Sequence, residues 1–142
     1  MKPGAEPTWN QPYEPLSAST QKTWGTKKQK AVVVDGARTK SSTGDEESPG
    51  TPMGDVWEIP IVAPVAKERK SASYYPTQKP RALLERLISA VTNPGDLVLD
   101  AYAGSGTTLE AAKMLGRVPC GIDQSEEAIA VMAKRLDAEV PT

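Results

Sequence analysis

The sequence predicts an α/β fold, an incomplete parallel sheet flanked by helices, which follows a poorly ordered N-terminal segment. Two observations predict it. Between residues 80 and 136, apolar residues recur in the order helix, strand, helix, strand, helix, which is the order of one βαβ unit with parallel strands and flanking helices. Before about residue 54, the chain is dense in Pro, Gly, Ser, Thr and Lys and shows no sustained period of 2 or 3.6.

The composition limits the classes of protein to consider. The chain has 142 residues, 38% of them hydrophobic and 5% aromatic, with a mean hydropathy of -0.45, which suits one ordinary domain with a thin core. One cysteine excludes an internal disulfide, and the absence of His excludes most zinc, haem and histidine-base chemistry. No run approaches the roughly 18 apolar residues of a membrane span. We expect a soluble, cytoplasmic protein without a metal.

The first 53 residues are predicted to be disordered or rich in linker sequence. Their one exception is AVVVD at residues 31–35, which is a candidate short strand. The stretch STGDEESPGTP at residues 42–52 has the composition of a linker. The domain proper is therefore expected at residues 54–142.

The ordered part begins with a β-rich segment at residues 56–62, where Pro60 allows only an edge strand or an extended segment. Pro80 suits the first turn of a helix. The apolar residues that follow it repeat at helical spacing: Leu83, Leu84, Leu87, Ile88 and Val91. NPGD ends this helix and leads into a strand at residues 97–100.

A second helix is predicted from Thr107 or Thr108 to Leu115, with Gly116 as its C-terminal cap. Residues 117–123 form the second strand. Ser125 then caps a third helix over residues 126–136, with acidic residues in its first turn and basic residues in its last.

Charge is unevenly distributed along the chain. Residues 67–86 carry six basic and two acidic side chains, although the net charge of the chain is -1. Such a block is either a solvated face or a phosphate-facing patch. The pattern leaves both readings open.

A glycine turn, AYAGSGTT, follows the strand LVLD that ends at Asp100. Ligands of open α/β sheets bind beyond the carboxyl ends of the strands. Gly104 and Gly106 remove side chains where a ligand would approach, and the next helix presents free N–H groups. Asp123 ends the second strand about 17 residues after Gly106, near the place where such folds put an acid on a ribose diol.

Two nucleotide-binding loops do not fit this turn. The phosphate loop GxxxxGK needs a lysine where this chain has Thr107, and the fingerprint GxGxxG needs a glycine where it has Leu109. Asp100 would repel a pyrophosphate but suits an amine. An acid for an amine, glycines for backbone approach and an acid for a ribose together indicate S-adenosylmethionine. The alternative is a bare β-turn-α corner whose glycines serve only to make it tight.

YPTQKP, then NPGDLVLDAYAGSGTT, then LGR and GID resemble the C-terminal half of the bacterial DNA amino-methyltransferases. The similar stretch runs from about residue 54 to about residue 136, and the order of its motifs is that of the permuted subclass. The resemblance implies a Rossmann-like S-adenosylmethionine-dependent methyltransferase fold. It also implies methylation of adenine N6 or cytosine N4 in double-stranded DNA, as in restriction–modification systems.

The resemblance also implies site residues. Thr77, Gln78 and Lys79 would approach the methionine end of the cofactor, and Asp123 would hold the ribose hydroxyls. The glycine turn and the start of the helix after it would surround the methionine and the sulfonium of the cofactor. These residues are Asp100, Ala101, Tyr102, Ala103, Gly104, Ser105, Gly106, Thr107 and Thr108. The chain departs from the family at Ala101 and Tyr102, where the family usually has Pro and Phe.

The family binds the target amine with a loop of Asp, Asn or Ser, then two prolines, then an aromatic residue, and this sequence has no such loop. NQPY at residues 10–13 lacks the first proline and follows no buried strand, so we assign no catalytic residue. The chain is predicted to be the cofactor-binding half of the enzyme, either as a fragment or as one half of a split enzyme in which a second polypeptide carries the catalytic half. The alternatives are a non-catalytic remnant that binds the cofactor or a partner, and a small-molecule methyltransferase, against which YPTQKP argues.

Overall fold

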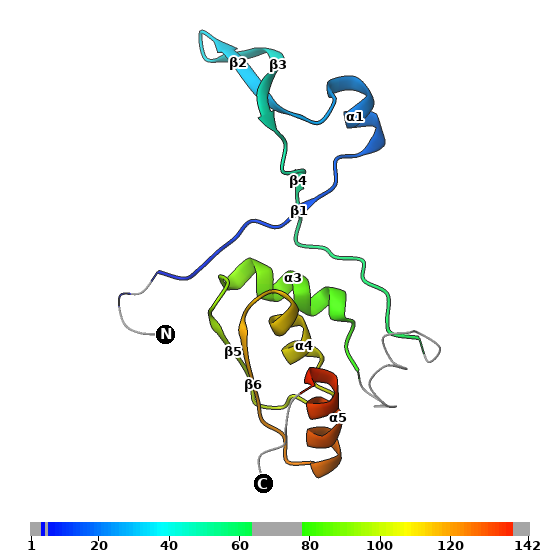
Figure 1. The fold of residues 1–142 in the computed structure, drawn as a ribbon. Helices are drawn as coiled ribbons and strands as arrows, with labels where there is room; N and C mark the ends of the chain where they lie inside the picture. Colours follow the sequence, from blue (N-terminus) through cyan, green and yellow to red (C-terminus); the bar gives the residue numbers. More distant parts are fainter. Residues whose placement is uncertain (1–3, 5, 64–77, 138–142) are drawn as a thin grey trace. The chain divides into compact units, whose positions relative to one another are not determined.

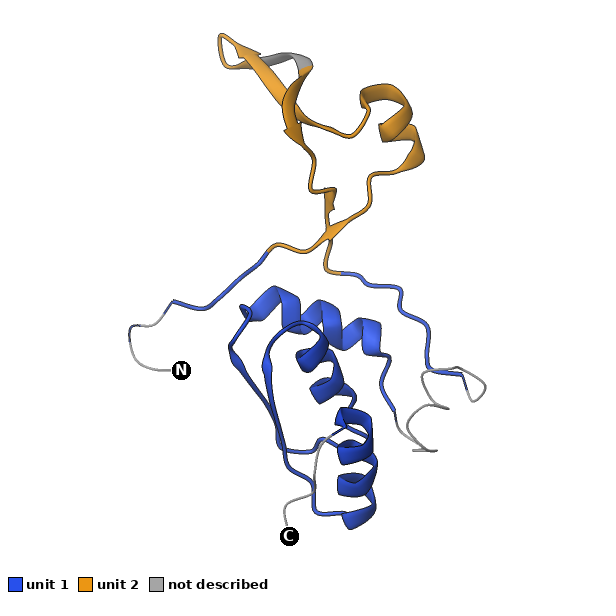
Figure 2. Cartoon of the chain, viewed as in Figure 1, with its two compact units in different colours: residues 1–10, 56–142 blue, residues 11–55 orange. Residues whose placement is uncertain are grey.

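The structure, a computed structural model, describes residue 4, residues 6–63 and residues 78–137 (Figure 1). The chain divides into two compact units. One comprises residues 11–55 and the other residues 1–10 and 56–142, and Figure 2 shows them in different colours.

The unit of residues 11–55 is built around a β-hairpin. Strand β2 (Lys27–Val34) pairs antiparallel with β3 (Ala37–Glu47). A helix, α1 (Ala18–Trp24), precedes the hairpin, and the short strands β1 (Tyr13–Glu14) and β4 (Thr51–Pro52) pair with each other.

This hairpin differs from the sequence prediction. The candidate strand at residues 31–35 lies largely within β2, but the stretch 42–52, interpreted as a linker, contributes the end of β3 and all of β4. The apolar period was absent because every residue of β2 is exposed. The signal that could have found the hairpin is Asp35-Gly36, both at positive φ (51° and 78°), because Asp-Gly is a preferred pair for a two-residue hairpin turn.

The unit that contains the glycine turn has the predicted order of elements. It consists of α3 (Arg81–Val91), β5 (Leu97–Asp100), α4 (Thr107–Met114), β6 (Val118–Gly121) and α5 (Glu126–Leu136). Strands β5 and β6 pair in parallel, with Leu97 opposite Val118 and Asp100 opposite Gly121. The predicted α/β fold with its parallel pair is confirmed.

The ends of these elements follow from their local chemistry. Pro80 was expected in the first turn of α3. It is instead the N-cap, one residue before the helix begins. Gly116, two residues after the end of α4, has φ of 73°, and Ser125 Oγ accepts a hydrogen bond from the N–H of Ala128 at 3.3 Å. Residues 56–62 belong to no strand, so of the two predicted possibilities, an edge strand or an extended segment, the strand does not form.

The core lies on one face of the parallel pair. The three helices lie on one side of the strands (Figure 1), where buried side chains form two small clusters. The first joins Ile88 of α3 to Ala111 and Ala112 of α4. The second joins Ala103 and Leu109 to Met132 of α5. Leu109 is 1% exposed, and it anchors α4.

The other face of the sheet is apolar and exposed. Leu97 and Leu99 of β5 are 65% and 59% exposed, and Val118 of β6 is 53% exposed. Alternate residues of a strand point to opposite faces, so these three side chains lie opposite the helices. Parallel sheets are ordinarily covered on both faces.

No helix in the described ranges is long and apolar enough to cross a membrane.

Candidate functional site

A cavity of about 270 Å³ lies at the carboxyl ends of β5 and β6, as the fold predicts. Its walls come from the segment before α3, from α3 itself, from the turn between β5 and α4, and from the end of β6. The residues that line it are Lys79, Leu84, Asp100, Tyr102, Ala103, Gly104, Ser105, Thr107, Thr108 and Asp123.

Asp123 holds the glycine turn from the end of the neighbouring strand. Its Oδ2 accepts a hydrogen bond from the backbone N–H of Gly104 at 2.8 Å, and its Oδ1 accepts one from the N–H of Ser125 at 3.0 Å. The hydrogen bonds from Ser125 and then Gly104 lower the pKa of Asp123 below its ordinary value. The carboxylate is therefore ionised, and each oxygen keeps a lone pair for a further donor.

Asp100 stands at the end of β5 on the other side of the turn. Its Oδ1 accepts a hydrogen bond from the N–H of Tyr102 at 3.1 Å. Tyr102 is 92% exposed, so its ring is free to contact a ligand in the cavity or a neighbouring surface. Asp100 and Asp123 thus both line one small cavity.

The two glycines of the turn do different things. Gly104 lines the cavity and has φ of 51°. Gly106, at φ of 73°, does not line it: a Cβ there would lie 2.6 Å from Met132 Cγ. Gly106 is therefore required by the packing of the turn against α5.

The structure gathers most of the predicted site residues and separates a few. Ala101 and Gln78 do not line the cavity, and Thr77 lies outside the described residues. Leu84, in the first turn of α3, lines the cavity and was not predicted as a site residue. Its only sequence signal was its place in the apolar stripe of that helix, which equally indicates a core position.

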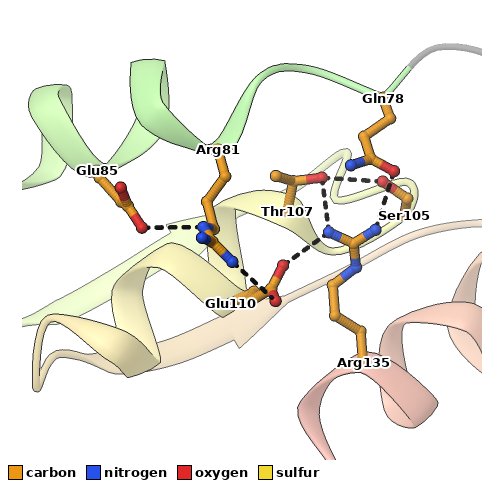
Figure 3. A network of polar contacts seen from close by, with 7 residues as sticks. All are labelled: Gln78, Arg81, Glu85, Ser105, Thr107, Glu110 and Arg135. Atoms are coloured by element: carbon orange, nitrogen blue, oxygen red, sulfur yellow. Dashed lines mark hydrogen bonds and ion pairs between the residues drawn. The ribbon is translucent and has the colours of Figure 1, made fainter. Parts of the chain in front are cut away.

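Beside the cavity lies a polar network that the sequence did not indicate (Figure 3). Its centre is Arg135 of α5, whose side chain is 3% exposed. The guanidinium donates to Glu110 Oε2 at 2.8 Å, to Thr107 Oγ1 at 3.2 Å and to Gln78 Oε1 at 3.0 Å. Arg81 NH1 lies 3.6 Å from the other oxygen of Glu110.

The basic block at residues 67–86 is only partly visible. Its first three basic residues lie outside the described residues. Lys79 lines the cavity, Arg81 pairs with Glu85 at 3.0 Å, and the guanidinium of Arg86 lies 5.2 Å from the centre of the Trp57 ring. Arg81 and Arg86 thus have partners within the unit, which does not favour a phosphate-facing patch formed by them.

NQPY has a structural explanation. The Asn10 side chain donates to the carbonyl oxygens of Ser89 at 3.0 Å and Thr92 at 2.9 Å, at the C-terminal end of α3. Its backbone N–H donates to the carbonyl of Ala90 at 2.7 Å. These bonds satisfy carbonyls that a helix end leaves without partners. Asn10 does not line the cavity.

The chemistry open to the cavity is binding through hydrogen bonds and charge. Two carboxylates accept hydrogen bonds, the turn and the first residues of α4 offer backbone and hydroxyl groups, and Lys79 adds a positive charge. Within the described part of the chain, no group of three or more His, Cys, Asp or Glu side chains could hold a metal ion.

Comparisons with known proteins identify relatives of this chain. A family model described as DNA methylase matches residues 4–135. This match begins 50 residues before residue 54, where the stretch that resembles the DNA amino-methyltransferases starts. The chain is 46% identical over 97 residues to the type II methyltransferase M2.DpnII of Streptococcus pneumoniae, covering 68% of this chain and 35% of that protein. It is 46% identical over 84 residues to the DNA adenine methyltransferase YhdJ of Escherichia coli (strain K12), covering 59% and 28%.

Among solved structures, the cytosine-N4-specific PvuII DNA methyltransferase is similar with a TM-score of 0.53 and 25% identity, covering 59% of this chain and 32% of that one. The chain spans about a third of the length of the curated relatives that it matches. The match of the family model extends over nearly the whole sequence. The chain belongs to the DNA methylase family.

Proposed function

We propose that this chain is the cofactor-binding half of a DNA amino-methyltransferase. The complete enzyme transfers a methyl group from S-adenosylmethionine to the exocyclic amine of adenine (N6) or cytosine (N4) in double-stranded DNA. The observation that carries the proposal is the cavity at the carboxyl ends of β5 and β6, with a carboxylate on each side of a glycine turn, in a chain of the DNA methylase family.

The donor groups of the cavity fit S-adenosylmethionine. Asp100 suits the amine of the methionine moiety, because a carboxylate at the end of a strand attracts a cation and repels a phosphate. Asp123 suits the ribose hydroxyls, because each of its oxygens keeps a lone pair beyond the bond it accepts from the backbone. When bound, the cofactor supplies an electrophilic methyl group on a sulfonium.

The rest of the proposed site surrounds these two acids. Tyr102, Ala103, Gly104 and Ser105 would lie along the methionine, and Lys79 would approach it from the segment before α3. The role of Thr77 remains the expectation derived from the family, as do the cofactor contacts of Gln78, Ala101 and Gly106. The helix start at Thr107 and Thr108 completes the wall.

A second polypeptide would carry the catalytic half. Two features of the chain support this. The cavity, about 270 Å³, is at the lower limit of ligand pockets, which enclose roughly 300–1,000 Å³. The apolar face of the sheet formed by Leu97, Leu99 and Val118 is exposed. Further strands and helices of a methyltransferase domain would cover this face and complete the cavity. The complete enzyme would meet its DNA substrate in the cytoplasm.

The alternative is a remnant that binds the cofactor or a partner without chemistry. It is favoured by the lack of an amine-binding loop in the sequence. The two proposals share the cofactor site and differ in whether a complementary polypeptide restores methyl transfer.

Titration calorimetry with S-adenosylmethionine tests the shared site. We expect the full chain to bind, and Asp123→Ala to bind at least about tenfold more weakly, since hydrogen bonds to a charged acceptor are lost. The matched control is Asp96→Ala. Asp96 also accepts a backbone hydrogen bond, from Asn93 at 2.8 Å, but it precedes β5 and lies at the opposite end of the sheet. Equal affinity for the wild type and Asp123→Ala would contradict the proposal.

A further inference from the structure

Arg135 is a buried cation with three hydrogen-bond acceptors, two of them on α4 and one on the segment before α3. It lies in the last turn of α5, and its side chain is 3% exposed. A buried charge is costly unless it is paired and hydrogen-bonded. Glu110 of α4 supplies the countercharge at 2.8 Å, so the guanidinium is fixed next to α4.

The remaining contacts of Arg135 extend to both walls of the cavity. One terminal nitrogen donates to Thr107 Oγ1 at the start of α4, and the other donates to Gln78 Oε1 (Figure 3). Gln78 directly precedes Lys79, which lines the cavity, and Thr107 lines the cavity itself. Arg135 does not line it. Arg135 thus connects the segment before α3 to the start of α4, beside the glycine turn, and its own side chain stays outside the cavity.

We propose that Arg135 is a positioning residue of the cofactor site: through Gln78 and Thr107 it sets the position of Lys79 relative to the glycine turn. This inference rests on the proposed cofactor site. It assigns to Gln78 an indirect role, as the side chain by which the segment before α3 is held.

The geometry requires an arginine. The planar guanidinium presents donors in a fixed fork, so that it can bind Glu110 and Thr107 with one terminal nitrogen and Gln78 with the other. A lysine at this position keeps the charge and can pair with Glu110, but its ammonium is a compact point charge that cannot span the same three acceptors. Arg135→Lys therefore separates pairing of the charge from positioning of Gln78.

The test combines Arg135→Lys, Gln78→Leu and the double variant of the full chain, each titrated with S-adenosylmethionine. We expect Arg135→Lys to bind roughly tenfold more weakly, as for loss of a charge-assisted hydrogen bond that orders a site. In the Gln78→Leu background, the same substitution should change the affinity little, because the bond through which it acts is already absent. Without cofactor, backbone amides of residues 79–84 should exchange faster with solvent in Arg135→Lys than in the wild type.

A matched control separates positioning from general weakening of α5. Lys113 donates to the carbonyl of Leu136, next to Arg135, at 2.6 Å, and it does not line the cavity. Lys113→Met should lower the melting temperature and leave the affinity unchanged.

The outcomes are distinct. If the wild type binds and Arg135→Lys binds equally well, or if the effects of Arg135→Lys and Gln78→Leu simply add, the positioning role is wrong while the cofactor site stands. If Lys113→Met weakens binding as much as Arg135→Lys does, the effect is one of α5 stability and the inference is wrong. If the wild type does not bind S-adenosylmethionine, the proposed function fails, and the inference fails with it.

Discussion

The carboxylate of Asp123 accepts a hydrogen bond from the backbone N–H of Gly104 at 2.8 Å. The bond joins the end of β6 to the turn that follows β5, across 19 residues of sequence. Asp123 therefore orders the glycine turn, and its carboxylate keeps lone pairs for further donors in the cavity that it lines. A substitution at this position acts on the turn as well as on the ligand.

This bond predicts an acid-dependent part of the stability. The pKa of Asp123 is lowered in the folded chain by hydrogen bonds from Ser125 and Gly104. The stabilisation is thus fully present above the unfolded pKa, near about 3.9, and is lost as the pH falls through the lowered folded value. As the pH falls below about 4, the melting temperature of the wild type should fall more steeply than that of Asp123→Asn. Parallel curves would contradict this.

The two glycines with φ of 73° provide a matched pair. At Gly116 an added Cβ meets nothing within 4 Å, whereas at Gly106 it lies 2.6 Å from Met132 Cγ. Gly116→Ala should cost only the left-handed strain, about 1–2 kcal/mol. Gly106→Ala should cost about 1–3 kcal/mol more, because it also overpacks the turn against α5. Chemical denaturation measures both, and equal costs would show that the turn does not pack against Met132.

Asn10 is predicted to be structural. Asn10→Ala removes its side-chain hydrogen bonds to the carbonyls of Ser89 and Thr92 and should cost about 1 kcal/mol of stability. Asn10→Asp should cost more, because it also places a negative charge at the C-terminal end of α3. Affinity for S-adenosylmethionine should be unchanged in both variants. Unchanged stability together with loss of methyl transfer in a complemented enzyme would instead assign NQPY a catalytic role.

The unit of residues 11–55 is predicted to open more readily than the unit that contains α3, α4 and α5 (the helical unit). None of the residues of this unit whose burial is described is buried, whereas Leu109 and Met132 are, and segments with few buried apolar contacts open at the lowest free energy. Limited proteolysis should therefore cut within residues 11–55 first. Cleavage after residue 80 that leaves this segment intact would contradict the prediction.

The elements of the helical unit could be predicted because their signals are local. The cap at Ser125, the glycine after α4 and the apolar strands at residues 97–100 and 117–123 each depend on a few neighbouring residues. The cavity also followed from the sequence, because a parallel pair brings the end of β5 at Asp100 and the residues just after β6, including Asp123, to one edge.

The rest depends on contacts between residues far apart in the chain. Gly106 had the same signal as Gly104, and only the position of Met132 distinguishes packing from ligand approach. Arg135 was interpreted as a basic residue that suits the last turn of α5, and its contact with Gln78, 57 residues away, leaves no local pattern. The hairpin of residues 27–47 lacked an apolar period because it is exposed.

The central claim is that this chain holds the methyl donor and does not hold the acceptor. Methyl transfer requires the amine nitrogen in line with the sulfonium methyl group, and positioning of this kind can contribute about 7–11 kcal/mol to lowering the barrier. The sequence has no stretch of Asp, Asn or Ser, two prolines and an aromatic residue, the loop with which the family binds the amine.

The most direct measurement is transfer of a tritiated methyl group to mixed genomic DNA. We expect background counts with the purified chain alone. Adding a polypeptide with a strand followed by Asp, Asn or Ser, two prolines and an aromatic residue should give turnover, which should fall with Asp123→Ala. Turnover well above background by the chain alone, surviving removal of residues 1–50, would show that the acceptor site lies in the remaining residues and would contradict the account.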